Sequence, residues 1–230
     1  MSLLKSLLSY VAPVPVWKGE GRYGPIRLVY ESGHLVVNSR HANQSWGSLH
    51  DVWQQCFADE GIQERKPRTV LILGFGAGSI ASILRRELRS VAPITGVDGD
   101  AAMLNIARDS FKMDKLPDLR LVHMDALEYI SAETGRYGLV LVDLFHELDL
   151  APGIDEEEFI RQLARITNVG GMVCFNTVAH NNLSTTRSQR TGQYLRLHFN
   201  EVREHRYNGI NHVFTASQAK AAPSALRPEV

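Results

Sequence analysis

The sequence predicts an α/β fold in which a seven-stranded, mainly parallel sheet carries helices on both faces. From Arg68 onward, short apolar runs alternate with stretches of helical periodicity, which is typical of parallel strands joined by crossover helices. A glycine-rich loop follows the first apolar run and leads directly into the first helical stretch. The alternation ends in two strand-like runs joined by Asn208-Gly209, a pair typical of hairpins, so we expect the last two strands to be antiparallel.

The apolar runs give the order of the elements. We expect parallel strands at 69–73, 94–98, 119–123, 139–143 and 172–176, followed by a hairpin of 201–207 with 211–217. Helical spacing predicts helices near 79–89, 100–111, 126–133, 156–166 and 184–199. A plain dinucleotide-binding domain closes with a sixth parallel strand, so the terminal hairpin favours a different class of α/β domain.

The first part of the chain predicts a small separate unit. Runs 26–30 and 34–38 flank a turn and predict a β-hairpin, and 48–60 has apolar residues at helical spacing. We therefore divide the chain into a hairpin and helix unit (1–64), a main domain (65–217) and a tail (218–230) that we expect to be disordered. Because a lone hairpin is not stable, we expect it to pack on the main domain or on a second subunit.

The composition excludes several classes of partner. Lys plus Arg and Asp plus Glu both number 25, so no net charge draws the chain to nucleic acid or to an anionic membrane. No apolar run approaches the roughly 20 residues of a membrane span, and we expect no secretion signal. The two cysteines lie far apart and the nine histidines show no ligand spacing, which indicates a reducing cytoplasm and no metal site. A small-molecule partner is favoured.

The loop Gly74-Phe75-Gly76-Ala77-Gly78 is the strongest sign of a binding site. Its glycines allow the backbone to turn sharply and to approach a ligand closely, with the start of a helix behind it. The spacing differs from the G-x-G-x-x-G of NAD-binding domains, because Ser79 stands where that motif requires glycine or alanine. We assign Gly74, Phe75, Gly76 and Gly78 to cofactor binding; a merely tight turn is the alternative.

Two acids at strand ends complete a nucleoside site. Asp98 ends the second strand about 20 residues after the loop, where an acid can accept hydrogen bonds from ribose hydroxyls. Asp98 could instead cap the next helix, although Asp100 is better placed to do so. Asp125 follows the third strand, where it can accept the exocyclic amine of adenine, cap the next helix, or do both. We assign the adjoining Gly99 and Ala126 to the same site.

The fourth strand brings Asp143 to the same edge of the sheet, with His146 and Glu147 close behind. An acid there can take a proton from an attacking amine or hold a substrate ammonium. We therefore assign Asp143 and His146 to catalysis, and Asp143 and Glu147 to substrate binding. The alternative is an acid that is simply solvated in a loop.

These residues resemble the spermidine synthase-like family, the relatives of polyamine aminopropyltransferases within the class I S-adenosylmethionine-dependent methyltransferase fold. The resemblance runs from about Tyr23 to Ser217 and rests on Tyr23-Gly24, Leu35-Val-Val-Asn38, Gln44, Val70 to Gly78, Val97-Asp-Gly-Asp100, Asp125-Ala126, Asp143 and Asn168-Val-Gly-Gly171. It implies a Rossmann-like seven-stranded sheet, S-adenosylmethionine or its decarboxylated form as co-substrate, and a homodimer. It also implies a substrate-binding role for Gln44, because a Gly-x-x-Gln segment precedes a helix near the active site in that family.

The chain departs from the aminopropyltransferase pattern in its polyamine half. Those enzymes carry an acid in the glycine loop that holds the amine of the decarboxylated donor, whereas this chain has Ala77. Their Asp-Ser-x-Asp-Pro becomes Asp143-Leu-Phe-His-Glu147, and their Asp-Glu-x-x-Tyr run after the glutamine is replaced within Ser45 to His50. An ammonium without a carboxylate partner in a closed pocket costs several kcal/mol, so Ala77 favours the intact donor.

We therefore expect a transferase that passes a methyl or related alkyl group from S-adenosylmethionine to a small nucleophile, an amine in the first instance. One alternative is a true spermidine synthase, which transfers an aminopropyl group from the decarboxylated donor to putrescine. A second is a nucleoside-binding module without catalysis, and an NAD oxidoreductase is the weakest hypothesis.

Two charged groups suggest only structural roles. Arg187, Arg190 and Arg196 have the spacing of a solvated helix face, and Asp155-Glu-Glu-Glu158 is typical of the acidic first turn of a helix.

Overall fold

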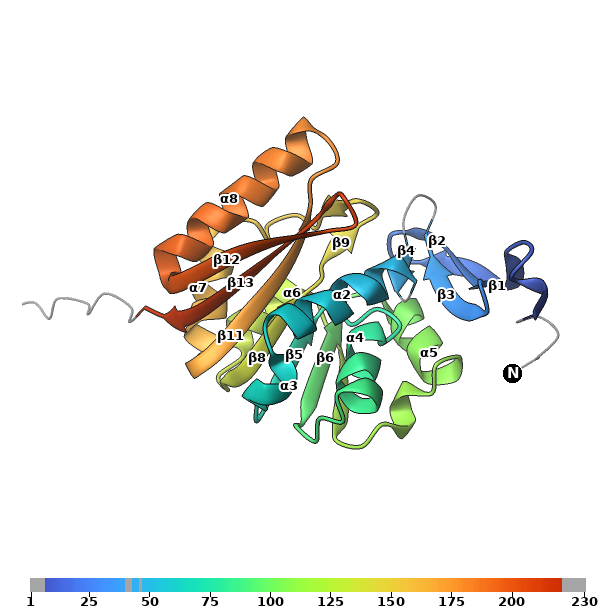
Figure 1. Ribbon diagram of the computed structural model, residues 1–230, viewed down its shortest axis with the longest axis horizontal. Coiled ribbons are helices and arrows are strands. Elements are labelled where there is room, and N and C mark those ends of the chain that lie inside the picture. Colours follow the sequence, from blue (N-terminus) through green and yellow to red (C-terminus); the bar gives the residue numbers. More distant parts are fainter. Residues whose placement is uncertain (1–6, 40–42, 46, 221–230) are drawn as a thin grey trace, which may run out of the picture.

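The computed structural model describes residues 7–39, 43–45 and 47–220, and for 43–45 it describes the backbone alone. Its central feature is a seven-stranded sheet in the order β12-β13-β11-β8-β5-β6-β7 (Figure 1). The strands are β5 (Val70–Leu73), β6 (Ile94–Asp98), β7 (Leu119–His123), β8 (Tyr137–Val142), β11 (Thr167–Val178), β12 (Phe199–Tyr207) and β13 (Asn211–Ala219). The five strands from β11 to β7 are parallel, while β13 is antiparallel to both β11 and β12. The predicted fold class is confirmed.

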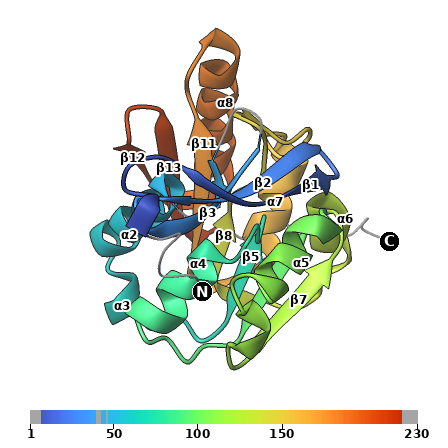
Figure 2. The same cartoon turned by 90° about the vertical axis from the view of Figure 1, so that its right-hand side faces the viewer.

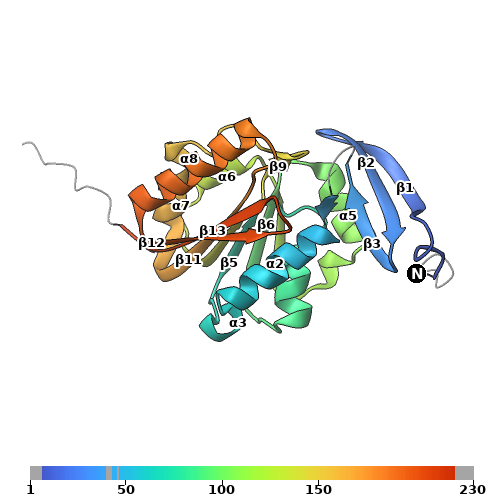
Figure 3. The same cartoon turned by 45° about the horizontal axis from the view of Figure 1, so that its top comes forward.

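Helices cover both faces of this sheet because its strands are apolar on both sides. In β5, Val70 and Ile72 point into one core and Leu71 and Leu73 into the other. The first core contains residues of α2 (Ser48–Asp59), α3 (Ile62–Arg65), α4 (Ser79–Ser82), α5 (Ala101–Asp109) and η2 (Met113–Lys115). The second contains residues of α6 (Ala126–Ala132), α7 (Glu157–Ile166) and α8 (Asn182–His198). Figure 3 shows α2 lying along the sheet on the side away from α7 and α8.

The helix expected at 79–89 is interrupted. After α4 the chain continues as a π-helical turn, η1 (Ile83–Glu87), in which Leu88 N–H donates to Ile83 O. The extra residue per turn shortens the regular helix to its first four residues.

The N-terminal hairpin belongs to a four-stranded antiparallel sheet, β1 (Val14–Gly21), β2 (Gly24–Glu31), β3 (His34–Asn38) and β4 (Asn43–Ser45) (Figure 2). The pairing of β2 with β3 was expected, whereas β1 was not. Most of β1 is exposed at the sheet edge, so it lacks alternating apolar residues, and a bulge follows Pro15. Its neighbour β2 buries Ile26 and Leu28 against α5, as expected for packing on the main domain.

At the end of the chain, β13 continues to Ala219 and so includes the first two residues of the range assigned to the tail, 218–230. Residues 221–230 lie outside the described residues, so a disordered tail there stays a prediction. In the part of the chain that the structure describes, no helix has the length and apolar character needed to cross a bilayer.

The predicted acidic first turn of α7 is confirmed for Glu157 and Glu158, whereas Asp155 forms an ion cluster with Arg187 and Arg190 of α8. A solvated face is wrong for Arg187, whose side chain is 17% exposed, and Arg196 is exposed as predicted.

Asp155 is 1% exposed and accepts hydrogen bonds from Arg187 and Arg190. Burial raises the pKa of Asp155, but the hydrogen bonds from the two arginines outweigh burial, so the pKa is lowered overall. Arg187 also donates to the carbonyl oxygens of Leu150 and Ala151, so α8 holds the end of the loop that follows β8.

We expect Arg187→Met to lower the free energy of unfolding by about 3 kcal/mol, because it leaves a buried carboxylate with one arginine and removes two carbonyl partners. Urea denaturation at neutral pH measures the change. Arg196→Met is the matched control, because Arg196 is an exposed arginine of the same helix. Equal losses in the two variants would contradict a special role for the cluster.

Candidate active site

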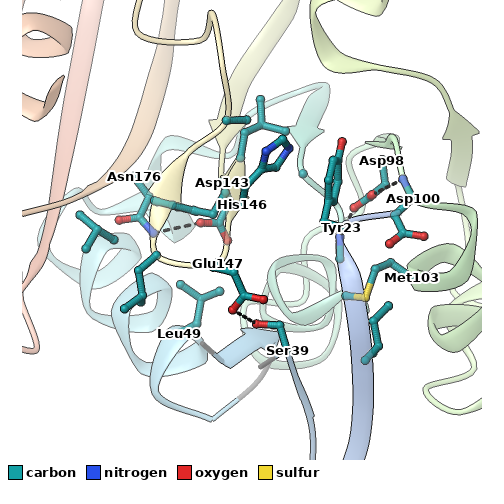
Figure 4. Close-up of a pocket in the computed structure, with 18 of the residues that line it drawn as sticks. Tyr23, Ser39, Leu49, Asp98, Asp100, Met103, Asp143, His146, Glu147 and Asn176 are labelled. Atoms are coloured by element: carbon teal, nitrogen blue, oxygen red, sulfur yellow. Dashed lines mark hydrogen bonds between the residues drawn. The ribbon is translucent and has the colours of Figure 1, made fainter. Parts of the chain in front are cut away.

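A pocket opens at the carboxyl edge of the main sheet, where residues of the N-terminal sheet form part of its wall (Figure 4). It is lined by the glycine loop, the loop after β8, the carboxyl ends of β6 and β11, the start of α2, and the N-terminal sheet. The lining includes six residues assigned from the sequence, namely Gly74, Gly76, Asp98, Asp143, His146 and Glu147. The acids at the ends of β6 and β8 therefore share one cavity.

The glycine loop depends on two of its glycines to turn beside this pocket. Gly74 has φ +85°, and a Cβ there would lie 2.1 Å from the carbonyl oxygen of Asp143. Gly78 has φ +91°, and a Cβ there would lie 2.5 Å from Met113 Sδ. Both positions therefore require glycine, for conformation and for space.

Two side chains of the loop point away from the pocket. The ring of Phe75 is buried over Gly96, where a Cβ would lie 2.2 Å from Phe75 Cδ2. Ala77 is fully buried in a cluster with Ile26 and Met103. The loop thus offers the pocket backbone atoms and no acidic side chain.

Asp98 is bound to the loop by its carboxylate. Its Oδ2 accepts the N–H of Gly76 over 2.7 Å, and its Oδ1 accepts the N–H of Asp100 over 2.8 Å. Burial raises the pKa of Asp98 to about 6, and these two hydrogen bonds offset part of the rise. The N-cap of α5 is Asp100, which accepts the N–H of Ala102 over 2.8 Å, so the capping alternative for Asp98 is wrong.

The residues expected at the adenine end lie beside the pocket rather than in its lining. Asp125 is the N-cap of α6, where its Oδ1 accepts the N–H of Leu127 over 3.0 Å. Its Oδ2 lies 3.6 Å from Arg22 Nη1. Phe75, Gly78, Gly99, Asp125 and Ala126 are all absent from the lining of the pocket.

Asp143 is held by two hydrogen bonds from distant parts of the chain. Its Oδ1 accepts Asn176 Nδ2 of β11 over 2.9 Å, and its Oδ2 accepts Trp53 Nε1 of α2 over 3.1 Å. Burial raises the pKa of Asp143 to about 6, partly offset by these two donors. The carboxylate is therefore fixed in orientation, and the alternative of a simply solvated acid is wrong.

The loop after β8 carries two further polar side chains into the pocket. The ring of His146 contacts that of Tyr23 of the N-terminal sheet, with ring centroids 3.9 Å apart and the ring planes tilted by 35°. Burial and the positive charge of Arg22 lower the pKa of His146, which favours the neutral ring near pH 7. Glu147 has φ +59° and accepts a hydrogen bond from Ser39 Oγ over 2.6 Å.

The pocket is acidic although the chain is neutral. Asp98, Asp100, Asp143 and Glu147 line it, and among the described residues no lysine or arginine does. Such a lining attracts a cation and raises the cost of binding an anion.

Sequence reasoning missed the partners that fix Asp143. Trp53 has the spacing of a core residue of α2, and its N–H donor gives no sign of its target. Asn176 could have been noticed in the sequence, because it is a polar residue at the end of a predicted parallel strand, where ligand sites form. In the structure it is fully buried. The backbone of Gln44 lies in β4, but its side chain is outside the described residues.

The residues described hold no group of three or more metal-ligating side chains that could bind an ion. The carboxylates of Asp98 and Asp143 are separate from one another, and each accepts hydrogen bonds from backbone or side-chain N–H groups.

Three comparisons with known proteins agree with this geometry. Residues 70–171 match the family model of a methyltransferase domain. The probable spermidine synthase of Corynebacterium glutamicum aligns over 91% of this chain and 82% of its own, with 17% identity and a TM-score of 0.70. The chain has the class I methyltransferase fold in its spermidine synthase-like form. Human methyltransferase-like protein 13, solved with SAH, aligns over 78% of this chain and 85% of its own, with 20% identity and a TM-score of 0.60.

A curated relative also resembles the chain. The polyamine aminopropyltransferase of Chromobacterium violaceum is 25% identical over 111 residues, which is 48% of this chain and 42% of the relative. The chain thus spans less than half the length of that relative. The matching family model describes a methyltransferase domain and the curated relative is named an aminopropyltransferase, and both are transferases, the class that the sequence predicted.

The raised pKa of Asp143 predicts a pH-dependent stability difference. An acid whose pKa is raised on folding stabilises the protein below its unfolded value of about 3.9, and this contribution is lost as the pH rises through about 6. Relative to wild type, Asp143→Asn should therefore gain about 2 kcal/mol in unfolding free energy between about pH 4 and about pH 8.

Urea denaturation at intervals across that range measures the difference. Trp53→Phe removes one donor that lowers the folded-state pKa of Asp143, so it should extend the upper end of the window to higher pH. Parallel stability curves for wild type and Asp143→Asn would contradict a raised pKa.

Proposed function

We propose that the protein is an S-adenosylmethionine-dependent transferase that passes a methyl or related alkyl group to a small amine. One observation carries this proposal: Asp143 lies beside the glycine loop in a pocket whose charged lining is acidic. A sulfonium donor and an amine acceptor are both cationic near neutral pH, so this lining suits the pair.

The donor's nucleoside fits the loop and the two acids next to it. Asp98 faces the pocket with its carboxylate fixed by Gly76 and Asp100, as a ribose ligand requires. Asp125, at the end of the neighbouring strand, is the proposed partner of the adenine amine, with Gly99 and Ala126 beside it. The backbone of Gly74 and Gly76 borders the same cavity.

The donor supplies an activated leaving group at its sulfonium, so transfer depends mainly on in-line positioning of the acceptor. Asp143 would hold the acceptor ammonium and take one of its protons, which frees the nitrogen lone pair to attack the carbon of the donor. The electron pair of the broken carbon–sulfur bond stays on sulfur. His146, whose neutral ring is favoured, could receive the same proton.

The structure around Ala77 supports the intact donor over the decarboxylated one. Ala77 is buried among apolar residues of the N-terminal sheet and α5, so the loop has no carboxylate for a terminal ammonium. The intact methionine tail carries a carboxylate that balances its own ammonium and does not need that partner, although the acidic lining disfavours the carboxylate itself.

A second candidate is aminopropyl transfer to a polyamine precursor. Glu147 favours it, because this carboxylate lines the pocket and could hold a terminal ammonium in place of a loop acid. The curated relative also carries that activity in its name. A cytoplasmic location, a homodimer and the absence of a nucleic-acid acceptor stay predictions.

Calorimetric titration with each donor separates the two candidates. We expect the affinity for S-adenosylmethionine to be at least about tenfold higher than for its decarboxylated form, because burying an unpaired ammonium is unfavourable. Asp98→Asn should weaken both nucleosides, which controls for binding at the assigned site. A clear preference of the wild type for the decarboxylated donor would favour the second candidate and remove the first.

Asp143→Asn separates an enzyme from a nucleoside-binding module. Donor binding should persist, while turnover with the best acceptor from a panel of small amines should fall about 10²–10⁴-fold. Release of the thioether nucleoside measures turnover. No turnover by the wild type with any amine, alongside normal donor binding, would support a module without catalysis.

A further inference from the structure

The turn between β1 and β2 lies on the nucleoside side of the site. Arg22 N–H donates to Asp100 Oδ2 over 2.8 Å, and a Cβ on Gly21 would lie 2.4 Å from the same oxygen. Tyr23, next in sequence, lines the pocket, and its ring contacts the ring of His146. The backbone of this turn is therefore docked on the loop that follows β6.

The side chain of Arg22 contacts two groups assigned to the donor. Its Nη1 lies 3.3 Å from the carbonyl oxygen of Gly99 and 3.6 Å from Asp125 Oδ2. Asp125 Oδ1 already accepts the N–H of Leu127, so Oδ2 is the oxygen that an adenine amine would use. The guanidinium stands at that oxygen.

We propose that Arg22 competes with the donor's adenine for Asp125 and thereby sets the affinity for the nucleoside. The inference rests on the proposed function, and in it on the adenine role of Asp125. Arg22 acts here through Asp125 rather than on the reacting atoms.

Burial and geometry indicate that moving the Arg22 guanidinium away from Asp125 costs little free energy. The two side chains are 49% and 40% exposed, and exposed ion pairs contribute little to stability. Because the turn is held by the backbone N–H of Arg22, the guanidinium can leave Asp125 while the turn stays in place. Arginine keeps its charge at all relevant pH values, so ionic strength rather than pH should modulate the competition.

Methylthioadenosine is a suitable probe, because it carries adenine and ribose but no charge. Its binding tests the nucleoside site whichever of the two donors the protein uses. Calorimetry should show that Arg22→Ala binds methylthioadenosine up to about fivefold more tightly than the wild type does. This affinity ratio corresponds to the free energy of an exposed ion pair. Added salt should strengthen binding to the wild type by screening the pair, and should leave Arg22→Ala unchanged. Arg27→Ala is the matched control, an exposed arginine on β2 outside the pocket lining.

Asp125→Asn supplies the second test, since asparagine keeps the helix cap but removes the charge. In that background Arg22→Ala should no longer change the affinity, whereas independent effects would add. If the wild type binds the probe and Arg22→Ala binds it equally or more weakly, the inference fails and the proposed function stands. If the wild type does not bind the probe, the proposed nucleoside site fails, and this inference with it.

Discussion

The close approach of Gly74 to the backbone of Asp143 is the constraint on which the rest of the site depends. Any side chain at position 74 would occupy the space of the Asp143 carbonyl oxygen, so the loop after β5 and the acid after β8 are positioned together. Asp143 then reaches Trp53 on α2 and Asn176 on β11. One tight contact between neighbouring strands therefore aligns a glycine loop, an acid, a tryptophan of the helix layer and an asparagine of the sheet.

The acidity of the pocket has a cost in folding free energy. Burial raises the pKa values of Asp98 and Asp143 to about 6, so near neutral pH both carboxylates are ionised in surroundings that disfavour their charge. A bound cation would relieve this. The site thus gives up folding stability in exchange for affinity toward positively charged ligands, a common trade at functional sites.

The sequence predicted the main sheet and the acids at its edge, because both follow from local patterns. Alternating apolar and helical stretches identify parallel strands, and strand ends in such sheets meet at one edge. β1 was missed because an exposed edge strand has no buried face to leave an apolar pattern. The buried Asp155 cluster and the donors to Asp143 were missed for another reason: their partners lie more than 30 residues apart, and helical spacing shows a residue's face without showing its neighbour.

Trp53 gives the protein a built-in optical reporter. Its indole is fully buried and donates to Asp143, so the negative charge it senses is that of the proposed acceptor site. Trp17 is the other tryptophan among the described residues; it lies on the outer strand of the small sheet and is 43% exposed, so these two indoles lie in surroundings of different polarity. Light absorbed by the buried ring would therefore register ionisation or occupancy of the pocket without any added label.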